Sequence, residues 1–254
     1  MSPPASSFHM PPAGLLTTAG SRPRLLASVR SAAEAAVAVA GGADIVDAKE
    51  PAHGALGAVA LDVLRQIRDV VPASIPLSAT IGDVSADDVH GIVERCEAMA
   101  ASVDIVKIGL FSPGDPQALF AALARNPAAH GRRVLVMLAD TPLDLSLLAH
   151  LPGAGFCGVM LDTADKSAGA LLDVIDEGMI ERFVFTARQA RIWMGLAGAL
   201  RLWHIPRVLR FSPDIVGFRG ALCRDGQRGG EIDAAAIAAV RRELSGGDGC
   251  CAAE

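Results

Sequence analysis

Short apolar segments, several of them β-branched, alternate along this chain with longer Ala- and Leu-rich segments in which apolar residues recur at helical spacing. The short segments predict β-strands and the longer ones predict helices. We expect strands at Leu25–Ser28, Asp44–Ala48, Leu77–Ile81, Asp104–Ile108, Val134–Leu138, Val159–Leu161, Ile192–Leu196 and Asp214–Phe218. We expect helices at Ser31–Ala40, Leu61–Asp69, Ala86–Ala100, Pro116–Ala124, Leu143–Ala149, Ala168–Ala187, Leu202–Leu209 and Ala234–Leu244.

The strand–helix unit therefore repeats eight times. Such alternation is typical of an α/β fold with a parallel sheet and right-handed crossovers, and eight units favour a closed TIM (β/α)8 barrel over an open sheet. A short internal repeat agrees, because Asp-Ile-Val begins at residues 44, 104 and 214. The starts are 104 − 44 = 60 and 214 − 104 = 110 residues apart, and 110 is about twice 55. A step of about 55 to 60 residues corresponds to two strand–helix units. The repeats then mark the second, fourth and eighth strands of a TIM barrel.

Length and composition fit one large domain. The chain has 254 residues, of which 51% are hydrophobic, and single α/β barrels reach this size. The pattern places the barrel domain at residues 24–245. Residues 1–23 are rich in Pro, Ser, Ala and Gly and predict a disordered extension, while residues 246–254 predict a flexible tail.

Charge and cysteine usage narrow the function classes. The net charge is −5 and the basic residues form no block, so we expect no nucleic-acid partner and no membrane partner. The five cysteines include no CxxC pair, which predicts reduced thiols and a cytoplasmic location. The six histidines are scattered, so we predict no metal site. The sequence leaves the oligomeric state open, a homo-oligomer included.

Lysine usage is the most informative feature of the composition. Only three of the 23 basic residues are lysines, namely Lys49, Lys107 and Lys166. Lysine can lose its proton and form an imine, whereas arginine effectively cannot. Genomic base bias with three random survivors is the alternative explanation, but all three lysines fall at or just beyond the C-terminal ends of even-numbered predicted strands.

The polar residues at the ends of these strands form a candidate site. Asp47, Lys107 and Asp162 each follow a three-residue strand core, and alternate strands of a barrel contribute side chains to a common layer. We therefore expect these three in one layer near the catalytic face. Lys49 lies two residues beyond Asp47 and points the same way, while Lys166 reaches in from the following loop.

This grouping suggests amine catalysis. A lysine must be neutral to attack a carbonyl, yet its ordinary pKa is about 10.4. Burial or a neighbouring ammonium group lowers that pKa, and two further lysines can supply the repulsion. Asp47 and Asp162 would then move protons, with Lys107 as an acid/base partner. Structural salt bridges at the strand ends are the alternative interpretation.

The loops after the seventh and eighth predicted strands suggest phosphate binding. In barrels these loops often bind phosphate through backbone N–H groups. One contains Gly198 and Ala199, and the other contains Arg219, Gly220 and Ala221. Each glycine allows a close approach of the backbone to a ligand. Ordinary strand-to-helix turns would look similar.

Six motifs between about Arg24 and Leu244 occur together in this chain. They are Gly-Gly-Ala-Asp-Ile-Val-Asp47-Ala-Lys49-Glu-Pro with Gly54-Ala-Leu-Gly57, Ser78-Ala-Thr-Ile-Gly-Asp83, Val106-Lys107-Ile-Gly-Leu110, Met160-Leu-Asp162-Thr-Ala-Asp-Lys166, Leu196-Ala-Gly198 and Asp214-Ile-Val-Gly-Phe-Arg219-Gly-Ala. Together they resemble the (5-formylfuran-3-yl)methyl phosphate synthase family of methanofuran biosynthesis. The chain departs from the family pattern at Ala55 and in a shortened segment around Asp140–Asp144.

The resemblance implies a TIM barrel that condenses two molecules of glyceraldehyde 3-phosphate and releases phosphate and water. It implies a Schiff base at Lys49 and an acid/base role for Lys107. Asp47, Asp162 and Lys166 fall on supporting catalytic positions. No metal and no organic cofactor is implied, and the partner is a small triose phosphate.

Two other functions remain open from the sequence. One is a class I aldolase of similar fold, which would form the same imine without releasing phosphate. The other is a non-catalytic barrel that binds a sugar phosphate. The three-lysine pattern speaks against the second alternative, because a binding site could use arginine instead.

Overall fold

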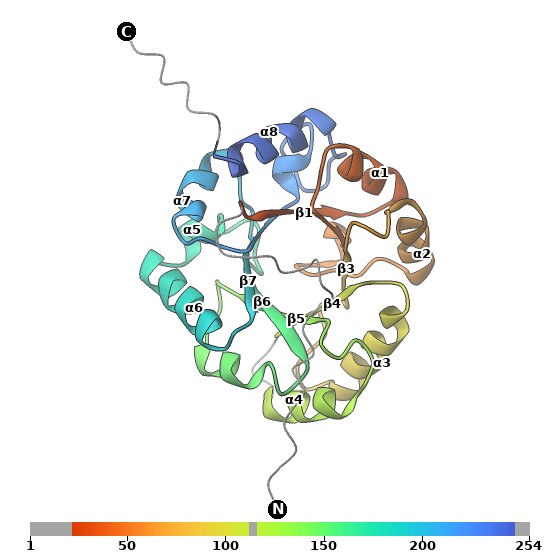
Figure 1. Cartoon of the computed structure of the whole chain (residues 1–254), viewed down its shortest axis with the longest axis vertical. Coiled ribbons are helices and arrows are strands. Elements are labelled where there is room, and N and C mark those ends of the chain that lie inside the picture. Colours follow the sequence, from red (N-terminus) through yellow and green to blue (C-terminus); the bar gives the residue numbers. More distant parts are fainter. Residues whose placement is uncertain (1–21, 112–115, 247–254) are drawn as a thin grey trace, which may run out of the picture.

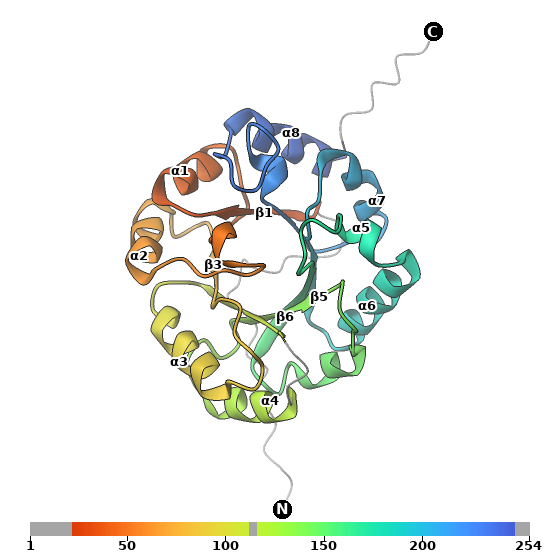
Figure 2. The same cartoon turned by 180° about the vertical axis from the view of Figure 1, so that it is seen from behind.

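Eight parallel strands form a closed barrel surrounded by helices in the computed structural model, which describes residues 22–111 and 116–246 (Figure 1). The strands pair in chain order, and β1 pairs with β8 to close the ring. The opposite view shows the same ring of helices around the strands (Figure 2). The predicted TIM barrel is confirmed. The predicted extension and tail fall mainly on residues 1–21 and 247–254, outside the described residues, although Arg22 forms an ion pair with Asp44 at 2.8 Å.

The strand bounds follow the predicted pattern closely. The strands are β1 (Arg24–Val29), β2 (Ile45–Ala48), β3 (Leu77–Thr80), β4 (Ile105–Gly109), β5 (Arg133–Leu138), β6 (Phe156–Asp162), β7 (Trp193–Leu196) and β8 (Ile215–Phe218). β6 begins at Phe156, three residues before the predicted start at Val159, and so includes Gly158. A Cβ atom on Gly158 would lie 2.3 Å from the Trp193 ring, so the glycine allows the close approach of that indole.

The helices surround the barrel, and four short 3-10 helices (η1 to η4) lie in its connections. They are α1 (Ala32–Ala40), η1 (Pro51–His53), α2 (Leu61–Val70), α3 (Val89–Ala100), α4 (Pro116–Arg125), η2 (Leu145–His150), α5 (Leu171–Val174), α6 (Glu177–Gln189), η3 (Leu202–His204), α7 (Ile205–Leu209), η4 (Gly220–Leu222) and α8 (Ala234–Leu244).

Three helix predictions need correction. The segment predicted as one helix at Leu202–Leu209 begins as the 3-10 helix η3 and continues as α7. The segment predicted as an α-helix at Leu143–Ala149 is the 3-10 helix η2, which begins after its N-cap Asp144. The long helix predicted at Ala168–Ala187 is two helices, α5 and α6. Ile175 between them has an extended backbone, and Asp176 caps α6 by accepting a hydrogen bond from the Met179 amide. A strong N-cap residue therefore starts a new helix inside a continuous apolar pattern.

Alternate strand residues face the barrel interior, and the others face the helices. The interior cluster contains Ile45, Ile105 and Met160, among others. A larger cluster joins the outward-facing strand residues to the helices. Two residues beyond the three interior residues lie Asp47, Lys107 and Asp162. The interior thus has an apolar floor, with a charged layer above it at the carboxyl ends of the strands.

The Asp-Ile-Val repeat has a structural role at the opposite end of the barrel. The side chains of Asp44, Asp104 and Asp214 accept hydrogen bonds from the amides of Leu25, Leu77 and Met194 at 2.8 to 2.9 Å. The amide of each aspartate donates to the carbonyl of the same residue. Each aspartate therefore fastens the start of its strand to the preceding strand.

Among the described helices, none is long and apolar enough to cross a membrane.

The aspartates Asp44, Asp104 and Asp214 should contribute to the stability of the barrel. Asp104 also pairs with Arg68 at 2.9 Å, so Asp104→Ala removes an ion pair and leaves the buried Leu77 amide without its side-chain acceptor. We expect a loss of about 1 to 3 kcal/mol in the free energy of unfolding, measured by urea denaturation. Asp69→Ala, at an exposed position of α2, is the control and should change stability little. Equal stabilities of the two variants would contradict the structural role.

Candidate active site

Asp47 is the deepest charged residue of the upper layer and has no exposed surface. Its carboxylate accepts hydrogen bonds from Ser28 Oγ at 3.0 Å, from Ser78 Oγ at 2.6 Å and from Lys107 Nζ at 3.0 and 3.1 Å. The strand register places Ser28 and Ser78 directly opposite Asp47 on the two flanking strands. A buried carboxylate is stable only when its charge and its lone pairs find partners, and here both do.

Lys49 stands one step nearer the mouth of the barrel. Its amide donates to the Val29 carbonyl at 2.9 Å, so the extended backbone continues past the end of β2. Lys49 and Asp47 therefore point to the same side. The Lys49 ammonium group donates to Asp162 Oδ2 at 3.2 Å, across the barrel on β6.

Asp162 is shared by two lysines. Its second oxygen, Oδ1, accepts from the Thr163 amide at 2.8 Å and from Lys166 Nζ. Lys166 also donates to the carbonyl and hydroxyl oxygens of Thr163, so its loop folds back over the end of β6. The Asp162 carboxylate thus accepts from two ammonium groups. In the described part of the chain, the Asp47 carboxylate accepts from one ammonium group, that of Lys107.

Burial and charge shift the pKa values of this group. Burial alone would raise the pKa of Asp162, but the charges of Lys49 and Lys166 and the hydrogen bonds it accepts hold that pKa well below its ordinary range. Burial lowers the pKa of Lys166 to about 8, against the opposing effect of Asp162 and with help from the charge of Lys49. Lys166 is therefore the lysine for which the structure gives a lowered pKa close to neutral pH.

The loop that carries Lys166 is held by Asp140, which follows β5. The Asp140 carboxylate accepts from the amides of Ala164 and Asp165, both at 2.7 Å. These bonds tie the loop after β6 to the end of the neighbouring strand. Asp140 therefore contributes to the position of Lys166 without entering the cavity.

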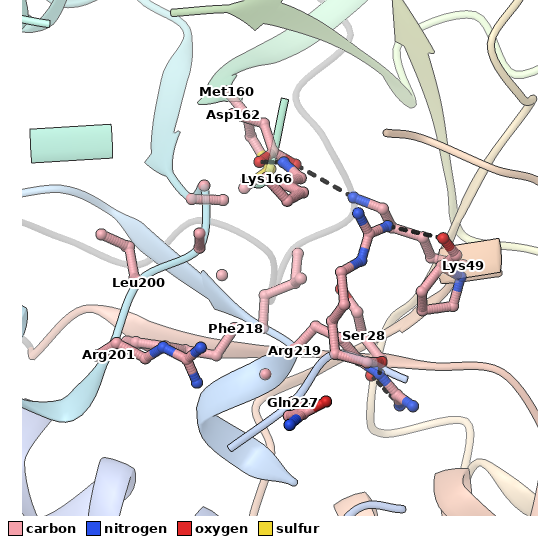
Figure 3. A pocket seen from close by; sticks show the side chains of 18 of the residues that line it. Ser28, Lys49, Met160, Asp162, Lys166, Leu200, Arg201, Phe218, Arg219 and Gln227 are labelled. Carbon is pink, nitrogen blue, oxygen red and sulfur yellow. Dashed lines mark hydrogen bonds and ion pairs between the residues drawn. The ribbon is translucent and has the colours of Figure 1, made fainter. Parts of the chain in front are cut away.

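A cavity of about 260 Å³ opens above the charged layer (Figure 3). All three lysines of the chain line it, together with Asp162, while Asp47 lies beneath its surface. Six cationic side chains but only one carboxylate form the lining. The cations are Lys49, Lys107, Lys166, Arg201, Arg219 and Arg228. Such an excess of positive charge favours an anionic ligand.

Two loops on one side of the cavity present free backbone amides. Gly198 and Ala199 after β7 have positive φ angles of 108° and 47°. Within the described residues, the amides of Ala199, Leu200, Gly220 and Ala221 donate to no protein acceptor. Gly198, Ala199 and Gly220 line the cavity, and Ala221 lies next to them in η4. We call these two loops the amide cradle.

Arg219 lines the cavity, but its guanidinium is occupied by the protein. It pairs with Glu34 of α1 at 2.5 Å and donates to the carbonyls of Ser28, Arg228 and Gly230. The predicted phosphate-binding residue Arg219 therefore ties the loop after β8 to β1 and α1. The sequence placed Arg219 in the predicted phosphate-binding loop after the eighth strand, and its contacts add a connection between loops.

Sequence reasoning missed four residues of this site: Ser28, Ser78, Arg201 and Arg228. The two serines had a signal, because each interrupts an apolar strand segment at an inward-facing position. The two arginines had none, since a sequence with 20 arginines does not show which ones face a cavity. In residues 22–111 and 116–246, no three His, Cys, Asp or Glu side chains come together as a metal site.

Comparison with solved structures supports the fold. Phosphoribosyl anthranilate isomerase from Thermus thermophilus has a TM-score of 0.59 at 12% identity and covers 88% of this chain and 98% of its own. Thiamine phosphate pyrophosphorylase from Pyrococcus furiosus has a TM-score of 0.58 at 13% identity, covering 89% and 96%. At these identities the likeness concerns the barrel alone.

Comparison with known sequences is more specific. A protein of Methylorubrum extorquens is 36% identical over 233 residues, covering 92% of this chain and 96% of that protein. The (5-formylfuran-3-yl)methyl phosphate synthase of Methanopyrus kandleri is 37% identical over 224 residues, covering 82% and 92%. The enzyme of the same name from Methanocaldococcus jannaschii is 33% identical over 223 residues, covering 82% and 94%. The model of the 4-HFC-P synthase family matches residues 25–241, and with these relatives it shows that the chain belongs to the (5-formylfuran-3-yl)methyl phosphate synthase family.

Proposed function

We propose that this protein is a lyase that condenses two molecules of glyceraldehyde 3-phosphate through an imine on Lys49. The product would be (5-formylfuran-3-yl)methyl phosphate, formed with release of phosphate and water, for methanofuran biosynthesis. The names of the relatives support this product, and the similarity in sequence extends over nearly the whole barrel.

The observation that carries the proposal is the convergence of all three lysines on one cavity. Lys49 Nζ lies 3.2 Å from Asp162, and Lys107 Nζ lies 3.0 Å from Asp47. Burying three amines and two carboxylates costs desolvation free energy even when they are paired, and such clusters are typical of functional sites. A binding site for a phosphate could use arginine alone.

In this proposal Lys49 is the nucleophile that attacks the carbonyl carbon of a triose phosphate. Asp162 accepts a hydrogen bond from its ammonium group and from that of Lys166, so a proton can pass between the two amines through one carboxylate. Lys107, held deeper by Asp47, is the acid/base partner that gives or takes protons at the bound carbon skeleton. No step needs a metal or an organic cofactor.

The amide cradle is the proposed phosphate site. Within the described residues, the backbone N–H groups of Ala199, Gly220 and Ala221 have no protein acceptor, and Gly198, with a positive φ, lines the cavity beside them. A Cβ atom on Gly220 would lie 3.3 Å from Arg201 Nη1, so the guanidinium of Arg201 stands beside the cradle. Amides and a guanidinium together form a strong site for a phosphate dianion.

Reductive trapping tests the imine. Glyceraldehyde 3-phosphate and borohydride should give an adduct that peptide mass spectrometry maps to Lys49, with phosphate released in parallel samples without borohydride. Lys49→Arg keeps the charge but cannot form the imine, so it should lose both the adduct and activity. An adduct without phosphate release would favour an ordinary aldolase. Absence of an adduct on every lysine would refute the imine mechanism for this substrate.

The role of Lys107 predicts a separation of binding from turnover. Lys107→Gln should lower kcat by about 10² to 10⁴-fold, because an acid/base group is lost, while the adduct on Lys49 still forms. Rapid-quench trapping and steady-state kinetics measure the two effects. Arg224→Gln, an exposed change in the loop after β8, is the control and should leave both unchanged. A Lys107→Gln variant with full kcat would remove Lys107 from the mechanism.

The three lysines allow a direct test of the lowered pKa. A protein labelled with ¹³C at lysine Cε should give three signals, which Lys→Arg variants assign. The Lys166 signal should titrate near pH 8, below the ordinary value of 10.5, because burial disfavours its charge. Lys166 is then protonated below pH 8 and neutral above it. If its proton is used in catalysis, kcat falls as pH rises through about 8; a Lys166 titration above pH 10 would contradict the burial.

A further inference from the structure

Three arginines line the cavity, but their charges are not compensated equally. Arg219 is paired with Glu34. Arg201 and Arg228 form no ion pair with any carboxylate in the described part of the chain. An uncompensated guanidinium beside a cavity attracts an anion, and its planar set of donors suits a phosphate. Arg201 and Arg228 could therefore bind one anion together or two anions separately.

Arg201 belongs to the amide cradle. Its Nη1 donates to the Gly226 carbonyl and lies beside Gly220, whose missing side chain leaves room for it. The first phosphate position, proposed above, thus consists of the cradle amides and Arg201.

Arg228 reaches a different part of the cavity. Its Nη2 donates to the carbonyls of Pro51 at 3.0 Å and Gly54 at 2.9 Å, in the loop that directly follows Lys49. The Arg228 carbonyl is held at 2.8 Å by Arg219 Nε. The side chain therefore extends from the loop after β8 to the loop after β2. Within the described residues, its Nε and Nη1 have no protein acceptor and are available to a ligand.

The charge of Arg228 also acts on Lys166. After burial and the charge of Lys49, the guanidinium of Arg228 is a further cause of the lowered pKa of Lys166. Both side chains also line the same cavity, so a dianion bound there can contact both and relieve the repulsion between their charges.

We infer that Arg228 and Lys166 form a second phosphate position, which binds the phosphate group that the reaction releases. This inference rests on the proposed function, since a condensation of two triose phosphates brings two phosphate groups to one cavity. The amide cradle with Arg201 holds one, and Arg228 with Lys166 holds the other, while Lys49 lines the same cavity.

The chemistry of release fits this position. The carbon–oxygen bond to the phosphate breaks and its electron pair leaves with the oxygen, while loss of a proton from the neighbouring carbon supplies the pair for the new double bond. Negative charge grows on the departing phosphate. A guanidinium and an ammonium group fixed beside it stabilise that charge, and Lys166 can supply a proton.

Binding of inorganic phosphate to the unreacted protein tests the second position without requiring an imine. Titration calorimetry should find two phosphates on the parent protein. Arg228→Ala should weaken one of them at least tenfold and leave the other unchanged. Arg228→Lys keeps the charge but loses the planar donors, so it should give an intermediate affinity. Arg224→Ala in the same loop is the matched control and should retain both.

The outcomes separate this inference from the proposed function. Two phosphates of unchanged affinity on Arg228→Ala would overturn the second position, even if trapping confirms the imine. Loss of both phosphates together would also overturn it, since Arg228 would then only hold the loops. Loss of one phosphate would support the position, even if borohydride traps no adduct on Lys49 and the imine mechanism fails.

Discussion

The burial of two aspartates among three lysines at one end of the barrel is the constraint on which the rest of the structure depends. Charges removed from water are stable only when opposite charges and hydrogen-bond donors replace the lost hydration. Asp47 meets this need with Lys107 and two serine hydroxyls. Asp162 meets it with Lys49, Lys166 and the Thr163 amide. The partners of Asp47 come from β1, β3 and β4, and Lys49 reaches Asp162 from the end of β2, so the charge network forms only in the closed barrel.

The two carboxylates create different environments for their lysines. Asp47 is enclosed and saturated, and it serves one lysine. Asp162 serves two, which leaves an excess of positive charge at the cavity side. The excess favours both an anionic substrate and the loss of a proton from one of the amines. A single arrangement of charges thus supports phosphate binding and amine chemistry together.

The barrel divides stability and function between its two ends. At the lower end, Asp44, Asp104 and Asp214 fasten neighbouring strands through short hydrogen bonds. At the upper end, the connections contain 3-10 helices and residues with positive φ, and several of their amides stay unpaired within the described chain. Unpaired amides weaken a loop by themselves, but they are what a phosphate ligand needs.

The sequence by itself determined the barrel and the chemistry of its inner layer. Strand residues alternate between two environments, so Asp47, Lys107 and Asp162 face inward wherever Ile45, Ile105 and Met160 do. The scarcity of lysine made Lys49, Lys107 and Lys166 recognisable before any fold was known. Asp176 is a residue type that favours an N-cap, but the apolar pattern around it predicted one continuous helix instead of α5 and α6.

The tertiary structure alone decided which of the arginines face the cavity and what each one does there. Glu34 and Arg219 are 185 positions apart, and Arg228 bonds to Pro51 across 177 positions. These contacts exist because β8 closes on β1, which brings the last loops beside the first ones. Local pattern carries no information about such distant pairs. The distinction between Arg219, which pairs with Glu34, and Arg201 and Arg228 at the same cavity, which form no ion pair within the described residues, therefore required the closed barrel.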